Sequence, residues 1–420
     1  MPETLAIDGG TPAVPEGMVK SWPPITQDDR DAVASVFDTD PLHTRWAPMA
    51  AELERRWAEY CGAKHCILTN GGTQSLHMAL LAVGVEPGDE VIVPAFSYWS
   101  SAAAIIQANA VPIFVDIEPH TFCIDPDLIE QAITKRTAAV MPVHIHGMPA
   151  DVDAIMDIAG HHGLPVVDDA CQAHGARYRG RTLGGLTDAT AFSLNRLKNL
   201  TGAEGGLLTT DSDAIYERAA ATGGMGGVTV KDDERERTFF GHGYNYRPQE
   251  LTAALALSQL DRLDQYNAQR REMAYYLTDA LMNYRGIFSS GAPAYAEPVY
   301  FMYIIAFEPD RLGLDIPLAD YKAKVWAALE AEGVPICQWQ PQIIPAMDFF
   351  QDRRGYAATP PWRFGRCTVS YDANDYPQAQ RFVASHAYVR GLHPPNGMDL
   401  MERYAEAFGK VLTQIDRVLA

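Results

Sequence analysis

The chain lacks paired cysteines, an excess of basic residues and long apolar runs. Its six cysteines are scattered with no C-x-x-C pair, so neither a zinc site nor a disulfide framework is indicated, and we expect free thiols. The net charge of −19 makes nucleic acid and anionic membranes poor partners. The N-terminus has neither the basic nor the apolar region of a signal peptide, and no apolar run reaches membrane-spanning length. A cytoplasmic protein is therefore expected.

The composition is that of an ordinary globular protein with more than one domain. Hydrophobic residues make up 47% and charged residues 21% of the 420 residues, a length that suits two domains. Residues 1–25 are rich in glycine and proline and predict an arm on the surface. We assign residues 26–284 to a large domain. Residues 285–420 form a smaller α+β domain that ends in a helix from Met398.

Strand and helix patterns alternate through the predicted large domain. A helical pattern covers residues 26–62, with Pro48 opening its second helix. A long amphipathic stretch runs from Pro248 to about Asn283, and the glycines of 223–227 predict a loop. The alternation predicts an α/β fold with a mainly parallel sheet between helices, which binds ligands at the carboxyl ends of its strands. The predicted strands are His65–Thr69, Glu90–Val93, Val111–Val115, Ala138–Pro142, Leu164–Val167, Ala189–Ser193 and Gly206–Thr209, and the predicted helices lie near 73–84, 98–108, 125–134 and 151–162.

The segment around Lys198 has the residues that a pyridoxal phosphate (PLP) site needs. An apolar run ends in Asp168 and Asp169, and Lys198 follows Ser193 and precedes a glycine-rich turn. A lysine amine can form a Schiff base with PLP, a carboxylate can hold a proton on the pyridine nitrogen, and a serine can bind a phosphate oxygen. Asp168 competes with Asp169 for the role of that carboxylate. The alternative for each residue is structural, because most lysines lie on the surface and aspartates often cap helices.

Two further segments also follow predicted strands. Gly71 and Gly72 open a predicted helix whose free N–H groups can bind phosphate, and Thr73 adds a hydroxyl. Tyr98 lies in an aromatic segment after the next strand, where its ring can stack on a flat cofactor or simply pack in the core. Phosphate donors, a stacking ring, a carboxylate and an amine, each after a predicted strand, are together an improbable product of chance.

Other candidates are weaker. His144 and His146 share one face if they lie in a strand, but two histidines are too few for a metal site, and we predict none. Asn245 and Arg247 precede the long helical stretch, where they can reach an anion or merely cap the helix. No G-x-G-x-x-G follows the first strand, which argues against a nicotinamide enzyme.

These motifs, in this order, resemble the DegT/DnrJ/EryC1/StrS aminotransferases. The resemblance rests on Asp-Ala-x-Gln-Ala-His-Gly-Ala from Asp169, Ser-x-x-x-x-Lys-Asn-Leu from Ser193, the Gly-Glu-Gly-Gly-like segment before Gly206, and Gly-Tyr-Asn-Tyr-Arg from Gly243. It is strong from Asp8 to about Leu263 and looser beyond. It implies PLP fold type I, with a mainly parallel seven-stranded sheet, and an enzyme that aminates keto sugars, usually nucleotide-linked, or keto cyclitols.

The resemblance also implies a role for each matching residue. Lys198 would be the Schiff-base lysine, and Asp169 would be the partner of the pyridine nitrogen. Asn245 would reach the cofactor of a neighbouring subunit, which implies a homodimer with shared sites. We name Arg247, Trp46 and His393 as candidates for substrate binding. The remaining cofactor contacts would be Gln172 at the ring hydroxyl, Tyr98 against the ring, and Gly72, Thr73 and Ser193 at the phosphate.

The substrate is the least constrained part of this prediction. The chain departs from the commoner family pattern at Asn195–Leu197, at Ala203, in the extra Gly71 and at Trp99. We predict transfer of an amino group from glutamate or glutamine to a keto sugar in nucleotide-linked form. The motifs are specific for the family but not for its substrate. The alternatives are a glutamine:keto-cyclitol aminotransferase, a sugar dehydratase and a non-catalytic regulator; the intact Lys198 argues against the last two.

Overall fold

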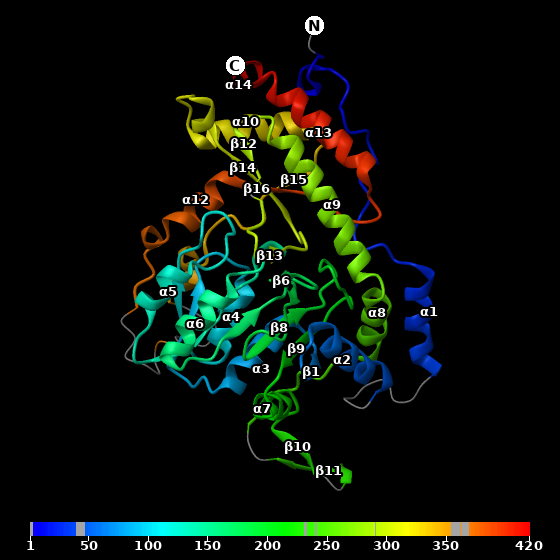
Figure 1. Cartoon of the computed structure of the whole chain (residues 1–420), viewed down its shortest axis with the longest axis vertical. Coiled ribbons are helices and arrows are strands. Elements are labelled where there is room, and N and C mark those ends of the chain that lie inside the picture. Colours follow the sequence, from blue (N-terminus) through cyan, green and yellow to red (C-terminus); the bar gives the residue numbers. More distant parts are fainter. Residues whose placement is uncertain are drawn as a thin grey trace.

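The computed structural model describes residues 3–38, 47–230, 233–239, 242–289, 291–353, 362 and 369–420. A large sheet with helices on its faces fills the lower part of the view in Figure 1, and a smaller sheet with its own helices lies above it. Helix α9 (Leu263–Leu281) runs from the lower part to the upper one, where both chain ends lie. Among the described residues, no helix has the length and apolar character that crossing a membrane requires.

Seven strands of the described chain form the large sheet in the order β1-β9-β8-β5-β4-β2-β3. Isolated parallel bridges join β4 to β5 at Val140–Val166 and Val143–Asp169. Strand β9 runs antiparallel to both of its neighbours, whereas the other described pairs are parallel. The predicted mainly parallel, seven-stranded sheet is thereby confirmed. The strands are β1 (His65–Thr69), β2 (Glu90–Pro94), β3 (Val111–Val115), β4 (Thr137–Val140), β5 (Val167–Asp169), β8 (Ala189–Ser193) and β9 (Gly206–Thr210).

Alternation along the strands supplies apolar side chains to both faces of this sheet. In β1, Ile67 joins one buried cluster, while Cys66 and Leu68 join another. The first cluster also takes residues of α3 (Gly72–Val83), α4 (Trp99–Gln107), α5 (Pro126–Ala132), α6 (Val152–His162) and α7 (Asp213–Gly223). The second takes residues of α2 (Pro48–Cys61) and α8 (Glu250–Leu260). Helices therefore cover both faces, as the sequence predicts.

One strand is displaced from its predicted position. The prediction was Leu164–Val167, but β5 spans Val167–Asp169. The N–H of Leu164 bonds to the Ala159 carbonyl and closes α6, and Pro165 has no N–H to give to a ladder. The shift makes Asp169 the last residue of the strand.

Three helical or loop predictions differ in detail. The pattern of residues 26–62 resolves into α1 (Gln27–Ser35) and α2, which begins at Pro48 as predicted. The stretch from Pro248 is broken into α8 and α9. The glycine-rich segment is a turn whose ends belong to elements, since Gly223 ends α7 and Gly227 opens β10 (Gly227–Val230), which pairs with β11 (Asp233–Phe239).

The C-terminal part has a separate antiparallel sheet and its own apolar cluster. The sheet order is β12-β14-β16-β15, and α9, α10 and α13 contribute to the cluster. Leu5 and Val14 of the N-terminal segment are buried in the same cluster. The division at residues 25 and 284 stays a prediction. The elements are β12 (Ile287–Phe288), β14 (Tyr303–Phe307), β15 (Ile336–Cys337), β16 (His386–Val389), α10 (Leu318–Ala331), α11 (Asp348–Asp352), α12 (Pro377–Ser385), α13 (Met398–Leu412) and α14 (Ile415–Leu419), and a third small sheet joins β13 (Ala296–Glu297), β6 (Arg177–Tyr178) and β7 (Arg181–Thr182).

Candidate active site

Lys198 lies in the turn between β8 and β9 and is partly buried. Its N–H bonds to the Asn195 carbonyl at 2.9 Å, and its Nζ lies 4.4 Å from the centroid of the Phe301 ring. Burial lowers the pKa of the Lys198 amine below its ordinary value, although the nearby charges of Asp169 and Glu204 act in the opposite direction. A lowered pKa leaves more of the amine neutral, which is the nucleophilic and basic form.

Asp168 and Asp169 follow each other in β5 but have different partners. The Oδ2 of Asp169 accepts a hydrogen bond from Ser101 Oγ at 2.7 Å, and its Oδ1 accepts one from the Cys171 N–H at 3.1 Å. The Oδ2 of Asp168 accepts a bond from Thr187 Oγ1 at 3.0 Å and lies 3.3 Å from His144 Nε2. Alternation turns the two carboxylates in opposite directions. Asp169 turns towards the N-terminal turn of α4, which carries Ser101.

The start of α3 forms a cradle that leaves no room for side chains. A Cβ on Gly72 would lie 2.8 Å from Ser193 Cβ and 2.9 Å from Cys171 Sγ. A Cβ on Gly206 would lie 2.5 Å from the Gly71 carbonyl carbon. The start of this 12-residue helix, with its free N–H groups and with Thr73 in the first turn, therefore packs closely against Ser193. This is the arrangement that a phosphate group requires, and it brings together residues predicted separately.

Tyr98 and Gln172 have different surroundings. Tyr98 precedes α4, is half exposed, and stacks on Trp339 with 6.1 Å between ring centroids and 23° between planes. Gln172 is buried, and its Oε1 accepts a hydrogen bond from the His146 N–H at 2.7 Å. The exposed ring of Tyr98 is available to a flat ligand, whereas the oxygen of Gln172 is already engaged within the chain.

The four remaining candidates do not gather around Lys198 in the same way. Asn245 is exposed, and its Oδ1 accepts a bond from Arg247 Nε at 2.9 Å. His393 lies 5.7 Å from the Trp22 ring, and Trp22 Nε1 donates to the Lys198 carbonyl at 3.1 Å, so His393 approaches the lysine through one intervening side chain. Trp46 lies outside the described residues. Their roles in binding stay predictions.

Sequence reasoning missed several residues of this region. Ser101 bonds to Asp169, Phe301 lies under the Lys198 amine, and Trp339 stacks on Tyr98. Ser101 is the third residue of α4, and Phe301 and Trp339 come from distant parts of the chain. No local pattern distinguishes them from ordinary packing residues.

His144 and His146 are buried but serve packing. Burial lowers the pKa of His146 to about 3, and its ring stacks on Phe382 at 5.6 Å and meets Trp339 at 5.5 Å. His144 Nδ1 accepts the N–H of Ala150 at 3.0 Å. Among the described residues, no group of three histidine, cysteine, aspartate or glutamate side chains is arranged to hold a metal ion.

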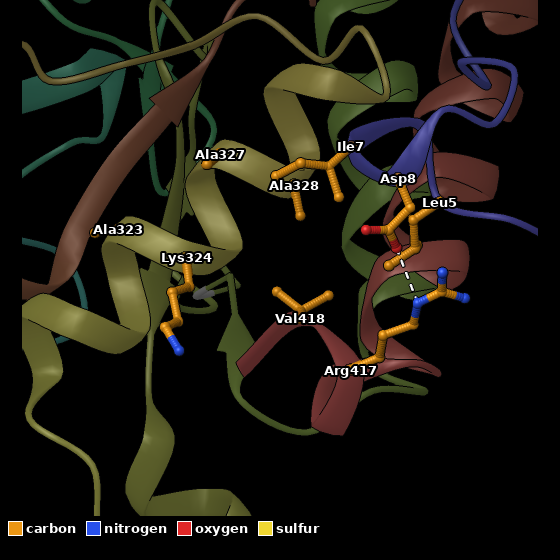
Figure 2. A pocket seen from close by; sticks show the side chains of 9 residues that line it. All are labelled: Leu5, Ile7, Asp8, Ala323, Lys324, Ala327, Ala328, Arg417 and Val418. Carbon is orange, nitrogen blue, oxygen red and sulfur yellow. Dashed lines mark ion pairs between the residues drawn. The ribbon is translucent and has the colours of Figure 1, made fainter. Parts of the chain in front are cut away.

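A second cavity lies far from this region, between the N-terminal segment, α10 and α14 (Figure 2). It has a volume of about 350 Å³ and mainly apolar walls that include Leu5, Ile7 and Val418. Its rim carries the ion pair between Asp8 Oδ2 and Arg417 Nε at 2.8 Å. We call it the terminal cavity.

Comparison with known proteins gives concordant matches. The model of the DegT/DnrJ/EryC1/StrS aminotransferase family matches residues 23–361. The chain is 35% identical to the L-glutamine:scyllo-inosose aminotransferase of Streptomyces griseus. The alignment, which is 434 positions long with its gaps, covers 100% of both proteins. It is 40% identical to the GDP-perosamine synthase of Caulobacter vibrioides over 251 residues, which cover 60% of this chain and 66% of that protein.

The fold and the cradle agree with these matches. A proposed sugar aminotransferase of Streptococcus pneumoniae, solved in its PLP form, superposes with a TM-score of 0.80 at 24% identity, covering 95% of this chain and 98% of that one. The glycine cradle at α3, the buried carboxylate of Asp169 and the amine of Lys198 fit PLP, and the protein is a PLP-dependent aminotransferase. The chain belongs to the DegT/DnrJ/EryC1/StrS aminotransferase family.

Proposed function

We propose that this aminotransferase moves the amino group of L-glutamine to a keto cyclitol of the scyllo-inosose class. The observation that carries the proposal is the 35% identity to an enzyme of that name along the whole of both chains. The match to GDP-perosamine synthase is slightly higher in identity but covers only 60% of this chain. The keto cyclitol therefore takes precedence over the nucleotide-linked keto sugar, which was the first prediction from the motifs.

We assign the cofactor contacts as follows. The N–H groups at the start of α3, with Thr73 and Ser193, hold the phosphate. Asp169 holds a proton on the ring nitrogen, and Ser101 and the Cys171 N–H fix the orientation of its carboxylate. Tyr98 lies against the ring. Gln172 stands by the ring hydroxyl, in reach while its oxygen stays bonded to His146.

Lys198 does the proton transfer in this proposal. When bound, PLP supplies a carbonyl that condenses with amines and a ring that accepts electrons from the donor's α-carbon. The Lys198 Nζ takes the proton from the donor's α-carbon in the first half of the reaction. In the second half, which runs in the reverse direction, it gives a proton to the carbon of the acceptor that receives the amino group. Its lowered pKa suits that task, because a protonated amine cannot act as a base. The same residues serve both halves of the reaction, first with glutamine and then with the keto cyclitol.

The proposal includes a homodimer in the cytoplasm. Asn245 is exposed, and among the described residues its side chain bonds to that of the neighbouring Arg247. That leaves its amide free to reach a cofactor held by a second copy, as the resemblance implies. The five described cysteines are free thiols, which is typical of a reducing compartment.

An absorbance and coupled assay tests the proposal. The protein is mixed with PLP, and its visible spectrum is recorded before and after adding L-glutamine, L-glutamate or L-alanine. A keto cyclitol and a nucleotide-linked keto sugar are then offered as acceptors in parallel. We expect glutamine to change the spectrum most and the cyclitol to be aminated, and we expect Lys198→Ala to reduce turnover roughly 10³-fold or more.

The outcomes separate the parts of the proposal. Amination of the nucleotide sugar but not of the cyclitol would reject the acceptor. A preference for glutamate would reject the donor. A Lys198→Ala variant with normal turnover would reject the role of the lysine.

A further inference from the structure

Arg270 of α9 is a buried cation that has no carboxylate partner among the residues that the structure describes. It is 3% exposed, and its guanidinium lies 4.4 Å from the centroid of the Trp22 ring. Its Nη1 donates to the Leu392 carbonyl at 3.3 Å, and its Nε has no hydrogen-bond partner among the described residues. Burial lowers the pKa of Arg270 to about 9. A buried charge is normally paired, because desolvation without a partner is costly, so this arginine is arranged for an anion that binds later.

Arg270 faces a cavity of about 460 Å³, which we call the Arg270 cavity. Lys20, Arg196 and Arg390 also line it, and no aspartate or glutamate is among the described residues of its wall. Four cations on one cavity are unexpected in a chain whose net charge is −19. The three additional side chains are exposed, whereas Arg270 is buried. The positive potential of the four cations is therefore focused towards the buried Arg270.

The Arg270 cavity adjoins the catalytic lysine. The Phe301 ring under Lys198 Nζ is part of the cavity wall. Trp22, which stacks under Arg270, also donates its Nε1–H to the Lys198 carbonyl. Arg196 lies two residues before the lysine. A ligand held by Arg270 would therefore lie against the same two side chains that contact Lys198.

We propose that the Arg270 cavity binds the carboxylate of the amino-acid donor, with Arg270 as its principal anchor. The planar guanidinium matches the two oxygens of a carboxylate, and the volume accommodates a molecule of the size of glutamine. A cyclitol carries no charge and would gain nothing from four cations. The donor assignment rests on the proposed aminotransferase reaction, whereas the binding of a carboxylate does not.

Two measurements test the site. The first is calorimetric titration with glutarate, a dicarboxylate that has no amino group and cannot react, so that it reports on the cavity alone. The second is the apparent Kd for L-glutamine in the single-turnover donor reaction, with the acceptor reaction measured alongside. For Arg270→Gln we expect both the glutarate and the glutamine affinities to fall by about 10- to 100-fold, and the acceptor reaction to change less than the donor reaction.

Further variants keep the proposal testable if substitution of the buried Arg270 prevents folding. Arg196→Gln changes an exposed residue and should weaken glutarate and glutamine about 3- to 10-fold. Arg270→Lys should recover part of the binding that Arg270→Gln loses, because it keeps the charge but not the planar fork. The matched control is Arg218→Gln, an exposed arginine of α7 that lines none of the cavities described above and should bind both ligands normally.

Each result bears on one part of the proposal. Equal glutarate affinity in the parent protein, Arg270→Gln and Arg196→Gln would overturn the carboxylate site. Glutarate binding that Arg270→Gln weakens, but that does not compete with glutamine, would overturn the donor assignment. Normal glutarate binding in a protein that no amino donor alters would instead count against the proposed reaction and leave the carboxylate site in place.

Discussion

The Arg270 cavity and the terminal cavity are of similar size but differ in how their charges are satisfied. Their volumes are about 460 and 350 Å³. In the terminal cavity, Arg417 is paired with Asp8, and the Lys324 amine bonds to the Leu419 carbonyl. In the Arg270 cavity, a buried guanidinium has one carbonyl and an aromatic ring as partners. Volume alone therefore does not mark a binding site, whereas an incompletely satisfied buried charge does.

After Lys198→Ala, the largest effect is expected from a comparison of the neighbouring carboxylates Asp169 and Asp168, which have different hydrogen-bond partners. Asp169→Asn keeps the shape of the side chain but cannot hold a proton on the ring nitrogen, so we expect kcat to fall about 10²- to 10³-fold. Asp168→Asn weakens the contacts to Thr187 and His144 and should cost about 1–3 kcal/mol in the free energy of unfolding while kcat stays near normal. Steady-state kinetics and urea unfolding of the two variants separate these effects.

The reverse pattern would exchange the roles of the two residues. A loss of kcat confined to Asp168→Asn would assign the cofactor contact to Asp168. It would also imply that the Ser101 bond to Asp169 is structural.

An intermediate effect is expected from acid, because neutral histidines are buried near the active site and none lines the terminal cavity. Burial lowers the pKa of His174 to about 3, so the folded protein keeps this ring neutral while the unfolded chain binds a proton below about pH 6.5. Its contribution to stability is complete above pH 6.5 and is lost as the pH falls towards 3, by roughly 1.4 kcal/mol per pH unit.

Comparing two histidine variants isolates that contribution. Between pH 6.5 and 5, the His174→Gln variant should lose about 2 kcal/mol less unfolding free energy than the parent protein. His120→Gln, at an exposed position, should follow the parent curve. Urea unfolding at the two pH values gives the answer, and parallel losses in parent and His174→Gln would show that this ring is not protonated on unfolding.

The sequence predicted much of the large sheet because apolar periodicity is a local signal. Seven strands, the helix start at Pro48 and the positions of Ser193 and Asp169 at strand ends follow from it. The displaced β5 shows the limit of the same signal, since Leu164 is apolar but its N–H closes a helix.

The Arg270 cavity could not be predicted in this way. Arg270 lies in an amphipathic pattern where arginine normally faces water, and only the packing of α9 against Trp22 and Leu392 buries it. Trp22, Lys198 and Phe301 come together from three distant segments, so their contacts depend on tertiary structure. Local patterns thus predicted candidate reacting groups, but not the side chains that surround them in the fold.

The smallest effect is expected when the same substitution is made in the terminal cavity. Arg417→Gln removes an exposed ion pair with Asp8, which should change the free energy of unfolding by less than about 1 kcal/mol. Glutamine affinity and turnover should match those of the parent protein, in contrast to Arg270→Gln. If Arg417→Gln weakened glutamine binding as much as Arg270→Gln does, loss of positive charge anywhere on this acidic protein would explain both, and the unpaired charge of Arg270 would have no special role.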